Sequence, residues 1–345
     1  MKATSSLTRL PTRIPTPEPA GTMSETRTVL VLTAAEDDTA DAVVAELEKL
    51  LTSVVRIDVG DFPVRMRLAA RHKGDRWRGR LWTDDVEIDL DRVGAAYYRR
   101  PTRFVLPSGL SAGDAVFATA EARLGFGGVL ASLDAMWINN PAKVAIAEYK
   151  PVQLKTAADA GLDIPQTLVT NDHGALVDFA ASVNGPVVCK TLSSLVLSER
   201  TVAEAIYTTP VEPAQVDPQQ LATTAHLVQQ WVPKVFDVRV TMVGRIPYAA
   251  AIHAGSDAAH LDWRADYPSL SYERIEPPTH VTAGMIRYLQ ALGLNYGAFD
   301  FVVQPDGTWR ALECNPNGQW LWLEHQVGLP IAAAVAGLLA KGTDI

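Results

Sequence analysis

The chain has little cysteine and no long apolar run. Two cysteines in 345 residues, Cys189 and Cys314, are too few for a secreted disulfide framework, so we expect reduced thiols and a cytoplasmic protein. The longest apolar run near the C-terminus, residues 331–340, spans ten residues, whereas a helix that crosses a bilayer needs about 20. We therefore expect no membrane partner.

An excess of positive charge is also lacking. The 31 Lys and Arg residues face 39 Asp and Glu residues, which gives a net charge of −8 and opposes unguided attraction to nucleic acid. The seven histidines show no paired ligand spacing, which disfavours zinc chemistry. Any acidic partner must therefore be held by a local group of basic side chains.

What is present is the composition of a soluble globular chain, with 48% hydrophobic and 20% charged residues. Residues 1–22 carry four prolines and no apolar block, so they resemble neither a signal peptide nor a transit helix. We expect a loose tail there, or a native start at Met23. The predicted divisions are a disordered tail over 1–26, an α/β domain over 27–140, a central lobe over 141–225 and a C-terminal lobe over 226–345.

Hydrophobic periodicity gives the order of the secondary-structure elements. The first part alternates strands and helices, which predicts an α/β domain; the segments are 29–33, 39–51, 54–59, 86–90, 95–99 and 112–133. The later part is an α+β pattern that becomes rich in strands after residue 226; its segments are 148–160, 166–170, 175–183, 186–190, 227–232, 235–243, 247–254, 280–292, 298–304 and 308–315.

The last predicted hairpin carries the most informative pattern. A two-residue loop at Asp306-Gly307 pairs residues whose numbers sum to 613, which places Asp300 opposite Glu313. Facing carboxylates repel, and Asn315 lies on the same face, so this set of oxygen atoms predicts a Mg²⁺ site. A register slipped by one residue would instead put the two acids on opposite faces.

Several basic residues are candidates for phosphate contacts. Lys190 ends an apolar strand and Lys150 begins a helix; together they can grip a nucleotide, or either can be an ordinary solvated lysine. Asp237 and Arg239 share one face of a strand, as a cleft wall or as a weak surface ion pair. Arg264 beside a tryptophan can clamp a carboxylate or phosphoryl oxygen, or be a loop charge.

The segment 97–103 places Arg99, Arg100 and Arg103 beside two tyrosines at a strand end. One interpretation is a docking site for an acidic peptide. The other is a row of solvated arginines with the tyrosines in the core, and the pattern leaves both open.

In this order the candidates resemble the ATP-grasp superfamily over about residues 139–340. The resemblance implies an ATP-grasp fold with an N-terminal pre-ATP-grasp domain and a nucleotide between two lobes. It implies adenine contacts from a hinge at Gln230, Trp231 and Val232, and further ATP contacts from Lys150, Lys190, Asp237 and Arg239. It also implies a Mg²⁺ site at Asp300, Glu313 and Asn315.

Within that superfamily, segments 140–141, 150–155, 164–167, 189–194 and 262–266 resemble the microviridin-type peptide ligases, or graspetide synthetases, and most closely their actinobacterial branch. The resemblance implies a ligase that uses ATP and Mg²⁺ to phosphorylate Asp or Glu side chains of a ribosomal precursor peptide with a leader and an acidic, Thr-rich core. Thr, Ser or Lys side chains then close lactones or lactams. Lys190, Arg239 and Arg264 would act in catalysis, and relatives suggest a homodimer.

Two departures from that pattern, and two alternative functions, stay open. Gln230 stands where the superfamily often has glutamate, and residues 191–194 lack the glycine-rich loop of many relatives. The chain could instead join free amino acids or small peptides, or be a catalytically silent peptide-binding scaffold. The intact acidic pair argues against a silent scaffold, because buried carboxylates without a cation are costly.

Overall fold

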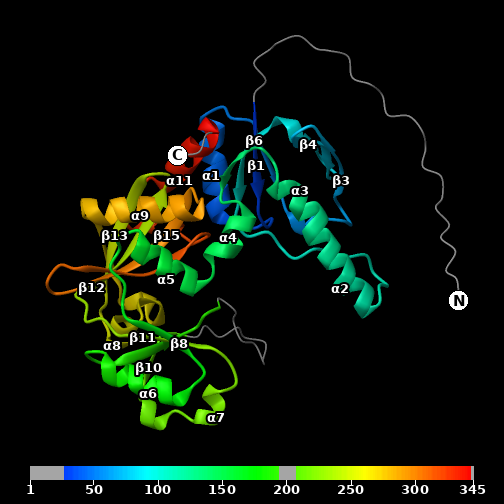
Figure 1. Cartoon of the computed structure of the whole chain (residues 1–345). Helices are drawn as coiled ribbons and strands as arrows, with labels where there is room; N and C mark the ends of the chain where they lie inside the picture. The colour runs from blue at the N-terminus through cyan, green and yellow to red at the C-terminus, as the bar shows by residue number, and fades with distance from the viewer. Residues whose placement is uncertain (1–26, 194–206, 343–345) are drawn as a thin grey trace, which may run out of the picture.

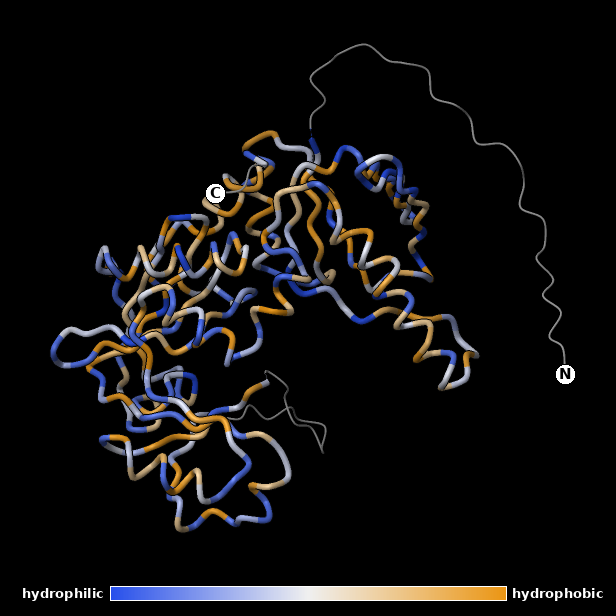
Figure 2. Tube along the Cα trace, viewed as in Figure 1, coloured by the Kyte–Doolittle hydropathy of each residue, from blue (hydrophilic) through white to orange (hydrophobic). Residues whose placement is uncertain are grey.

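The computed structural model describes residues 27–193 and 207–342, which form four sheets covered by helices (Figure 1). Within these ranges no helix is long and apolar enough to cross a membrane. Apolar segments concentrate in the strands and in the helix faces that pack on them, as the orange parts of the trace in Figure 2 show.

The first sheet is parallel, in the order β2-β1-β6-β7. Its elements are β1 (Thr28–Leu32), α1 (Asp38–Lys49), β2 (Val54–Ile57), β6 (Val93–Tyr98) and β7 (Met136–Ile138). Asp37 caps α1 by accepting from the backbone N–H groups of Thr39 and Ala40, which fixes where the helix begins. The predicted strand, helix, strand order is therefore confirmed.

A three-stranded antiparallel sheet adjoins this domain; the sequence analysis predicted its third strand, at 86–90, but not the other two. It consists of β3 (Arg67–Lys73), β4 (Arg76–Trp82) and β5 (Glu87–Asp89), with short helices η1 (Val59–Asp61) and η2 (Leu90–Arg92) at its borders. The single helix expected over 112–133 consists of α2 (Ala112–Glu121) and α3 (Gly127–Ala131), joined by the π-helical turn η3 (Ala122–Phe126). In Figure 1, α2 projects away from the rest of the chain.

The middle of the chain begins with two helices, α4 (Pro141–Ala147) and α5 (Lys150–Asp159). An antiparallel sheet follows in the order β10-β9-β11-β8. Its elements are β8 (Thr167–Thr170), α6 (His173–Ser182), β9 (Val187–Lys190), β10 (Thr209–Val211), η4 (Pro213–Gln215), α7 (Pro218–Leu221) and β11 (His226–Gln230). Leu176 of α6 packs in a small core with Val187 and Val228 of this sheet.

The C-terminal part is a five-stranded antiparallel sheet in the order β14-β13-β12-β15-β16. Its elements are β12 (Phe236–Val243), β13 (Ile246–His253), α8 (Asp257–Leu261), η5 (Trp263–Ala265), η6 (Tyr267–Ser269), β14 (Ser271–Ile275), α9 (Thr279–Leu292), β15 (Tyr296–Val303), β16 (Trp309–Asn315), α10 (Leu321–Val327) and α11 (Ile331–Lys341). Met285 and Leu289 of α9 are fully buried against Phe299 of β15, so this helix covers one face of the sheet.

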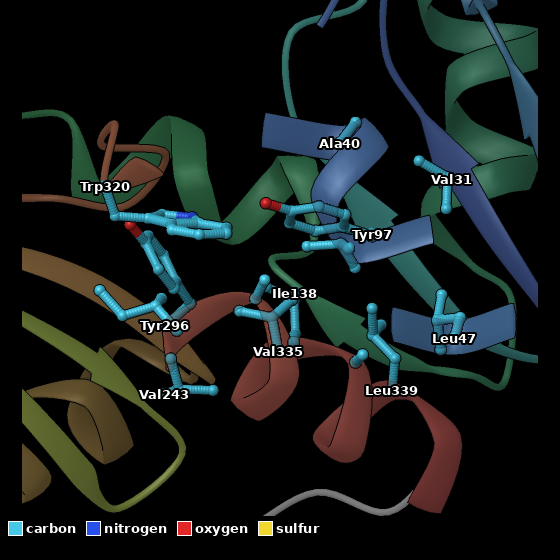
Figure 3. Packing of buried hydrophobic residues seen from close by; sticks show 14 of the residues in the cluster. Val31, Ala40, Leu47, Tyr97, Ile138, Val243, Tyr296, Trp320, Val335 and Leu339 are labelled. Atoms are coloured by element: carbon cyan, nitrogen blue, oxygen red, sulfur yellow. The ribbon is translucent and has the colours of Figure 1, made fainter. Parts of the chain in front are cut away.

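One core joins the N-terminal sheet to the end of the chain. Trp320 is fully buried and lies between Tyr97 of β6 and Tyr296 of β15 in Figure 3, with α1 and α11 closing the cluster. The buried side chain of Asn139 also crosses this junction, donating to the carbonyls of Tyr296 and Pro316. These contacts fix the β15–β16 hairpin against the first sheet.

Candidate functional site

The β15–β16 hairpin turns through a longer loop than expected. The Gln304 N–H donates to the Thr308 carbonyl at 2.9 Å, so three residues rather than two form the loop, and Val303 pairs with Trp309. Gly307 has φ +83°, a conformation that favours glycine. The predicted two-residue loop is therefore wrong, and its three-residue replacement alone would place Leu312 opposite Asp300.

A β-bulge restores the register that brings the two acids together. Asp300 pairs with Glu313 but Phe301 pairs with Ala311, so Leu312 is the extra residue of the bulge. The Ala311 N–H donates instead to the carbonyl of Asp163, at 2.7 Å. The predicted pairing of Asp300 with Glu313 is thus confirmed, because the bulge offsets the longer loop.

The two carboxylates have different cationic partners. Lys150 Nζ donates to Glu313 Oε2 at 2.8 Å, and Arg239 Nε lies 3.2 Å from Asp300 Oδ1. Burial, reinforced by repulsion from Glu313, raises the pKa of Asp300 above its usual range. Burial also opposes ionisation of Glu313, but the charges of Lys150 and Lys190 outweigh it and hold the pKa of Glu313 low.

The acidic pair leaves an acceptor unsatisfied. Arg239 Nε and Asp300 Oδ1 are buried and neither makes a hydrogen bond, so their attraction is that of charges at short range without a well-aligned N–H. A buried carboxylate oxygen without a donor suits a cation. Asn315 lies two residues beyond Glu313 on β16, near the surface, where its side-chain oxygen accepts from the N–H of Asn317.

These residues fit Mg²⁺ better than a soft metal. Within 27–193 and 207–342, no group of three or more His, Cys, Asp or Glu side chains is placed to hold a metal ion. Two carboxylates and one amide oxygen form a hard, incomplete set, which suits an ion that keeps waters and binds substrate phosphates.

A cleft beside the acidic pair collects most of the other candidates. It is lined by Lys150, Val188, Lys190, Thr191, Thr208, Gln229, Gln230, Trp231, Val232, Lys234, Asp237, Leu261, Asp262, Trp263, Arg264, Asp300, Val302, Leu312 and Glu313. Arg239 does not line this cleft. Its guanidinium lies next to Asp300 and 5.6 Å from the ring centre of Trp263. Ser194, at the end of the segment expected to replace a glycine-rich loop, falls outside the described residues.

Lys190 is a strongly perturbed cation of the cleft. Its ammonium donates to Gln229 Oε1 at 2.8 Å. Burial lowers the pKa of Lys190 to about 8, helped by the charge of Lys150 and opposed by the attraction of Glu313. The interpretation of Lys190 as an ordinary solvated lysine is therefore wrong.

The predicted hinge follows β11 along one side of the cleft. The Trp231 N–H donates to the Pro186 carbonyl at 2.9 Å, and the Trp231 ring meets His260 edge to face. The Gln230 side chain donates to the Asn184 carbonyl at 3.0 Å, so its amide is already engaged. The cleft is therefore lined mainly by backbone groups and apolar surface at Gln230, Trp231 and Val232.

Lys234 is a cleft residue that the sequence analysis missed. Its ammonium donates to both oxygens of Asp237, at 2.8 and 2.6 Å, and both side chains are buried. Burial raises the pKa of Asp237, although Lys234 opposes it. Asp237 and Arg239 share a strand face as predicted, but each has a different partner, so the interpretation of a surface ion pair between them is wrong.

Asp262 is the second missed residue, and it holds Arg264. Arg264 donates through Nε and Nη2 to the two Asp262 oxygens, at 2.9 and 2.7 Å. The backbone N–H and hydroxyl of Thr208 donate to the same carboxylate, whose pKa lies well below its usual range. The ion pair with Asp262 holds the planar guanidinium of Arg264 in the lining of the cleft. Arg264 is therefore not simply a solvated charge on a loop.

Comparisons with known proteins show which folds this chain resembles. Residues 28–145 match the family model of the MvdD pre-ATP-grasp domain. A RiPP-associated ATP-grasp ligase from Chryseobacterium gregarium, solved with ADP and a leader and core peptide, is 26% identical with a TM-score of 0.83, covering 92% of this chain and 97% of that one. No curated protein matches.

Two macrocyclases from Microcystis aeruginosa MRC are also similar. MdnC, bound with the precursor peptide MdnA, is 28% identical with a TM-score of 0.80 over 92% of this chain and all of MdnC. MdnB is 28% identical with a TM-score of 0.75, covering 91% of this chain and 99% of MdnB.

The fold and the matches together indicate an ATP-grasp ligase with an N-terminal pre-ATP-grasp domain. The solved structures to which the chain is similar are ATP-grasp ligases and macrocyclases that act on ribosomal precursor peptides.

Proposed function

We propose that this protein is an ATP-dependent macrocyclase of a ribosomally made precursor peptide. The observation that carries the proposal is the partly buried pair Asp300 and Glu313, which lies with Lys150 and Lys190 at one cleft. The similar ligase from Chryseobacterium gregarium was solved with ADP and peptide, and MdnC with its precursor, which supports both substrates.

The reaction has two steps. A peptide Asp or Glu carboxylate takes the γ-phosphoryl group of ATP, which gives an acyl phosphate and ADP. A Thr or Ser hydroxyl or a Lys amine then attacks the acyl carbon, phosphate leaves with the carboxyl oxygen, and an ester or amide remains. The peptide loses one water for each link. The cleft must therefore bring together ATP, the acidic peptide and the attacking hydroxyl or amine.

The proposed roles follow from charge and position. Asp300, Glu313 and Asn315 would hold Mg²⁺, which when bound offsets phosphate charge. Lys150 and Lys190 bind phosphate oxygens, Arg239 keeps Asp300 ionised, and Arg264 binds the acyl phosphate. The residues that frame the nucleotide are Gln230, Trp231, Val232 and Asp237.

The proposal includes three wider expectations. The nucleotide would lie between a central lobe over 141–225 and a C-terminal lobe over 226–345, behind the N-terminal domain over 27–140. The enzyme would work in the cytoplasm as a homodimer and belong to the actinobacterial branch of the family. Its substrate would be a peptide with a leader and an acidic, Thr-rich core.

Mass spectrometry tests the function. An acidic, Thr-rich candidate precursor peptide, sought among the short reading frames beside this gene and incubated with enzyme, ATP and Mg²⁺, is expected to lose one water per link while one ADP and one phosphate form. ATP consumption with free amino acids and an unchanged peptide would favour a small-molecule ligase. Binding of the peptide without ATP consumption would favour a silent scaffold.

The lowered pKa of Lys190 predicts a pH dependence of nucleotide binding. Above pH 8 the free amine is largely neutral and must take up a proton when phosphate binds, so Mg-ADP affinity should fall by up to about tenfold per pH unit. Lys190→Arg keeps its charge and should flatten this dependence. Calorimetry from pH 7 to 9.5, in buffers of different ionisation enthalpy, measures affinity and proton uptake; parallel curves for both proteins would contradict the assignment.

A further inference from the structure

The end of β16, which carries two of the candidate metal ligands, lies at the edge of its sheet. β15 pairs with one side of this strand, and within 27–193 and 207–342 no further strand pairs with the other side. Cys314 stands between Glu313 and Asn315, and its buried N–H donates to a side chain instead of to a strand. A buried N–H without an acceptor is costly, so this side chain completes the edge of the sheet.

Gln153 of α5 supplies the acceptor. Its Oε1 accepts from the Cys314 N–H at 3.1 Å, and its Nε2 donates to the carbonyl of Ala147, the last residue of α4, at 2.7 Å. Gln153 is only 7% exposed, so both hydrogen bonds are shielded from water. One buried amide therefore joins the strand of the candidate metal ligands to two helices.

The same helix carries the lysine that binds Glu313. Lys150 and Gln153 lie three residues apart on α5, and residues at this spacing are neighbours on a helix surface. Lys150 Nζ donates to Glu313 Oε2, while Gln153 accepts from the main chain of the next residue. α5 therefore holds both the side chain of Glu313 and the backbone beside it.

A second buried amide holds the backbone on the other side of Asn315. Asn139 donates to the Pro316 carbonyl at 2.8 Å, and both donors and both acceptor positions of its amide are used. Asn139 lies two residues before α4, and the carbonyl at the end of α4 is the one that Gln153 binds. The segment from Asn139 to Gln153 thus holds the chain immediately before and immediately after Asn315.

We propose that Gln153 is a positioning residue for the metal site, with Asn139 as its counterpart beyond Asn315. By accepting from the Cys314 N–H, Gln153 fixes the backbone from which the side chains of Glu313 and Asn315 extend. Ligands that are already in place lose less freedom when an ion binds, which favours an ion that demands regular geometry. This inference rests on the proposed function, of which the metal site is a part.

Gln153→Met tests the role, because it removes both hydrogen bonds at nearly constant size. In the protein without metal or nucleotide, the Cys314 amide should exchange its hydrogen about tenfold faster than in the wild type. Calorimetry with ADP should show that the half-saturating Mg²⁺ concentration rises by about tenfold or more, because partners that orient metal ligands have effects of this size. ADP affinity without Mg²⁺ should stay within about twofold of the wild type.

Two further variants separate positioning from stability. Gln153→Glu keeps an oxygen that can accept from the Cys314 N–H, so its half-saturating Mg²⁺ concentration should stay within about threefold of the wild type. Arg287→Met removes a different side chain that binds α5, since Arg287 Nε donates to the Ala160 carbonyl at 2.9 Å. This control should leave the Mg²⁺ dependence unchanged, whatever its effect on the Tm.

The wild-type protein provides a test that needs no substitution. If Gln153 already fixes the strand, Mg-ADP should slow hydrogen exchange at Cys314 by less than about twofold. A much larger slowing would show that the ion orders the strand, and would overturn the inference. So would an unchanged Mg²⁺ dependence in Gln153→Met, or equal losses in Gln153→Met and Gln153→Glu.

Failure of the proposed function has a different signature. Wild-type ADP binding that does not depend on Mg²⁺ would contradict the metal site itself, and with it a role for Gln153 in metal binding. Hydrogen exchange at Cys314 in Gln153→Met would still show whether Gln153 holds the strand. A defect in the inference alone leaves the wild-type Mg²⁺ dependence intact.

Discussion

Glu313→Gln is expected to abolish dehydration of the peptide, with kcat at least about 10³-fold below that of the wild type. The substitution keeps the shape of the side chain but removes the charge that faces Asp300 and accepts from Lys150 Nζ. A neutral amide is a poorer ligand for a hard cation, and Lys150 loses the partner that positions it.

The same substitution should leave the fold intact. Neutralising Glu313 removes the repulsion that raises the pKa of Asp300, and this gain offsets part of the lost ion pair with Lys150. We therefore expect a Tm within about 5 °C of the wild type. A large fall in Tm would mean that the loss of activity reflects unfolding.

Three measurements separate these effects. Mass spectrometry follows water loss, calorimetry follows Mg²⁺-dependent ADP binding, and thermal unfolding follows stability. Glu276→Gln, at an exposed site after β14, is the matched control and should behave as the wild type in all three. Full cyclisation by Glu313→Gln would remove Glu313 from the mechanism, and unchanged Mg²⁺-dependent ADP binding would remove it from the metal site.

The acidic pair shows which features of the site local sequence patterns can predict and which they cannot. Asp-Gly correctly located the turn, and the alternation of β15 and β16 correctly placed both acids on one face. These patterns did not predict the three-residue loop or the bulge at Leu312. The two features shift the strand register by one residue in opposite directions, so their effects on the pairing of Asp300 with Glu313 cancel. The bulge coincides with the tertiary hydrogen bond from Ala311 to Asp163, and no spacing within the hairpin encodes that contact.

The missed site residues share a different cause. Lys234 and Asp262 lie just outside regular elements, where charged residues are usually solvated, so nothing in their spacing distinguishes them. Their importance comes from burial beside the cleft, which only the packed structure provides. Strands β3 and β4 were missed because they are rich in arginine and largely exposed, which weakens the hydrophobic pattern.

Arg99 fits neither interpretation of the segment 97–103, whereas Arg100 and Arg103 are exposed and Tyr97 is in the core, as the second interpretation expected. The Arg99 side chain is 2% exposed and its Nε donates to Asp37 Oδ2 at 2.8 Å, so it is neither solvated nor free to dock a peptide. Its Nη2 also donates to Gln319 Oε1, which ties the first sheet to the segment after β16. The partner lies 62 residues away in sequence, so local pattern could not reveal it.

Arg99→Met is therefore expected to destabilise the protein by about 3–5 kcal/mol and to lower the apparent Tm by about 10 °C. The variant leaves the Asp37 carboxylate buried without its cation. In the wild type, burial raises the pKa of Asp37, but Arg99 and the Thr33 hydroxyl outweigh burial and hold it low. Arg100→Met removes a neighbouring arginine that forms no ion pair with described residues, and should cost less than about 1 kcal/mol.

The dependence of this loss on pH identifies its cause. The depressed pKa of Asp37 stabilises the wild type above the unfolded pKa near 4, and this contribution is lost as the pH falls. In Arg99→Met, burial acts unopposed and raises the pKa of Asp37, so protonation relieves the penalty on acidification. The difference in unfolding free energy between the two proteins should thus shrink from pH 7 to about pH 4.5.

A double variant makes the argument specific to charge. Asp37→Ser keeps an oxygen that can cap α1 but removes the carboxylate, so Asp37→Ser combined with Arg99→Met should be more stable than Arg99→Met alone. Urea unfolding of the four proteins gives the coupling energy. Equal losses in the single and double variants, at all pH values, would show that Arg99 acts through packing around Trp320 and Tyr97 rather than by neutralising a buried acid.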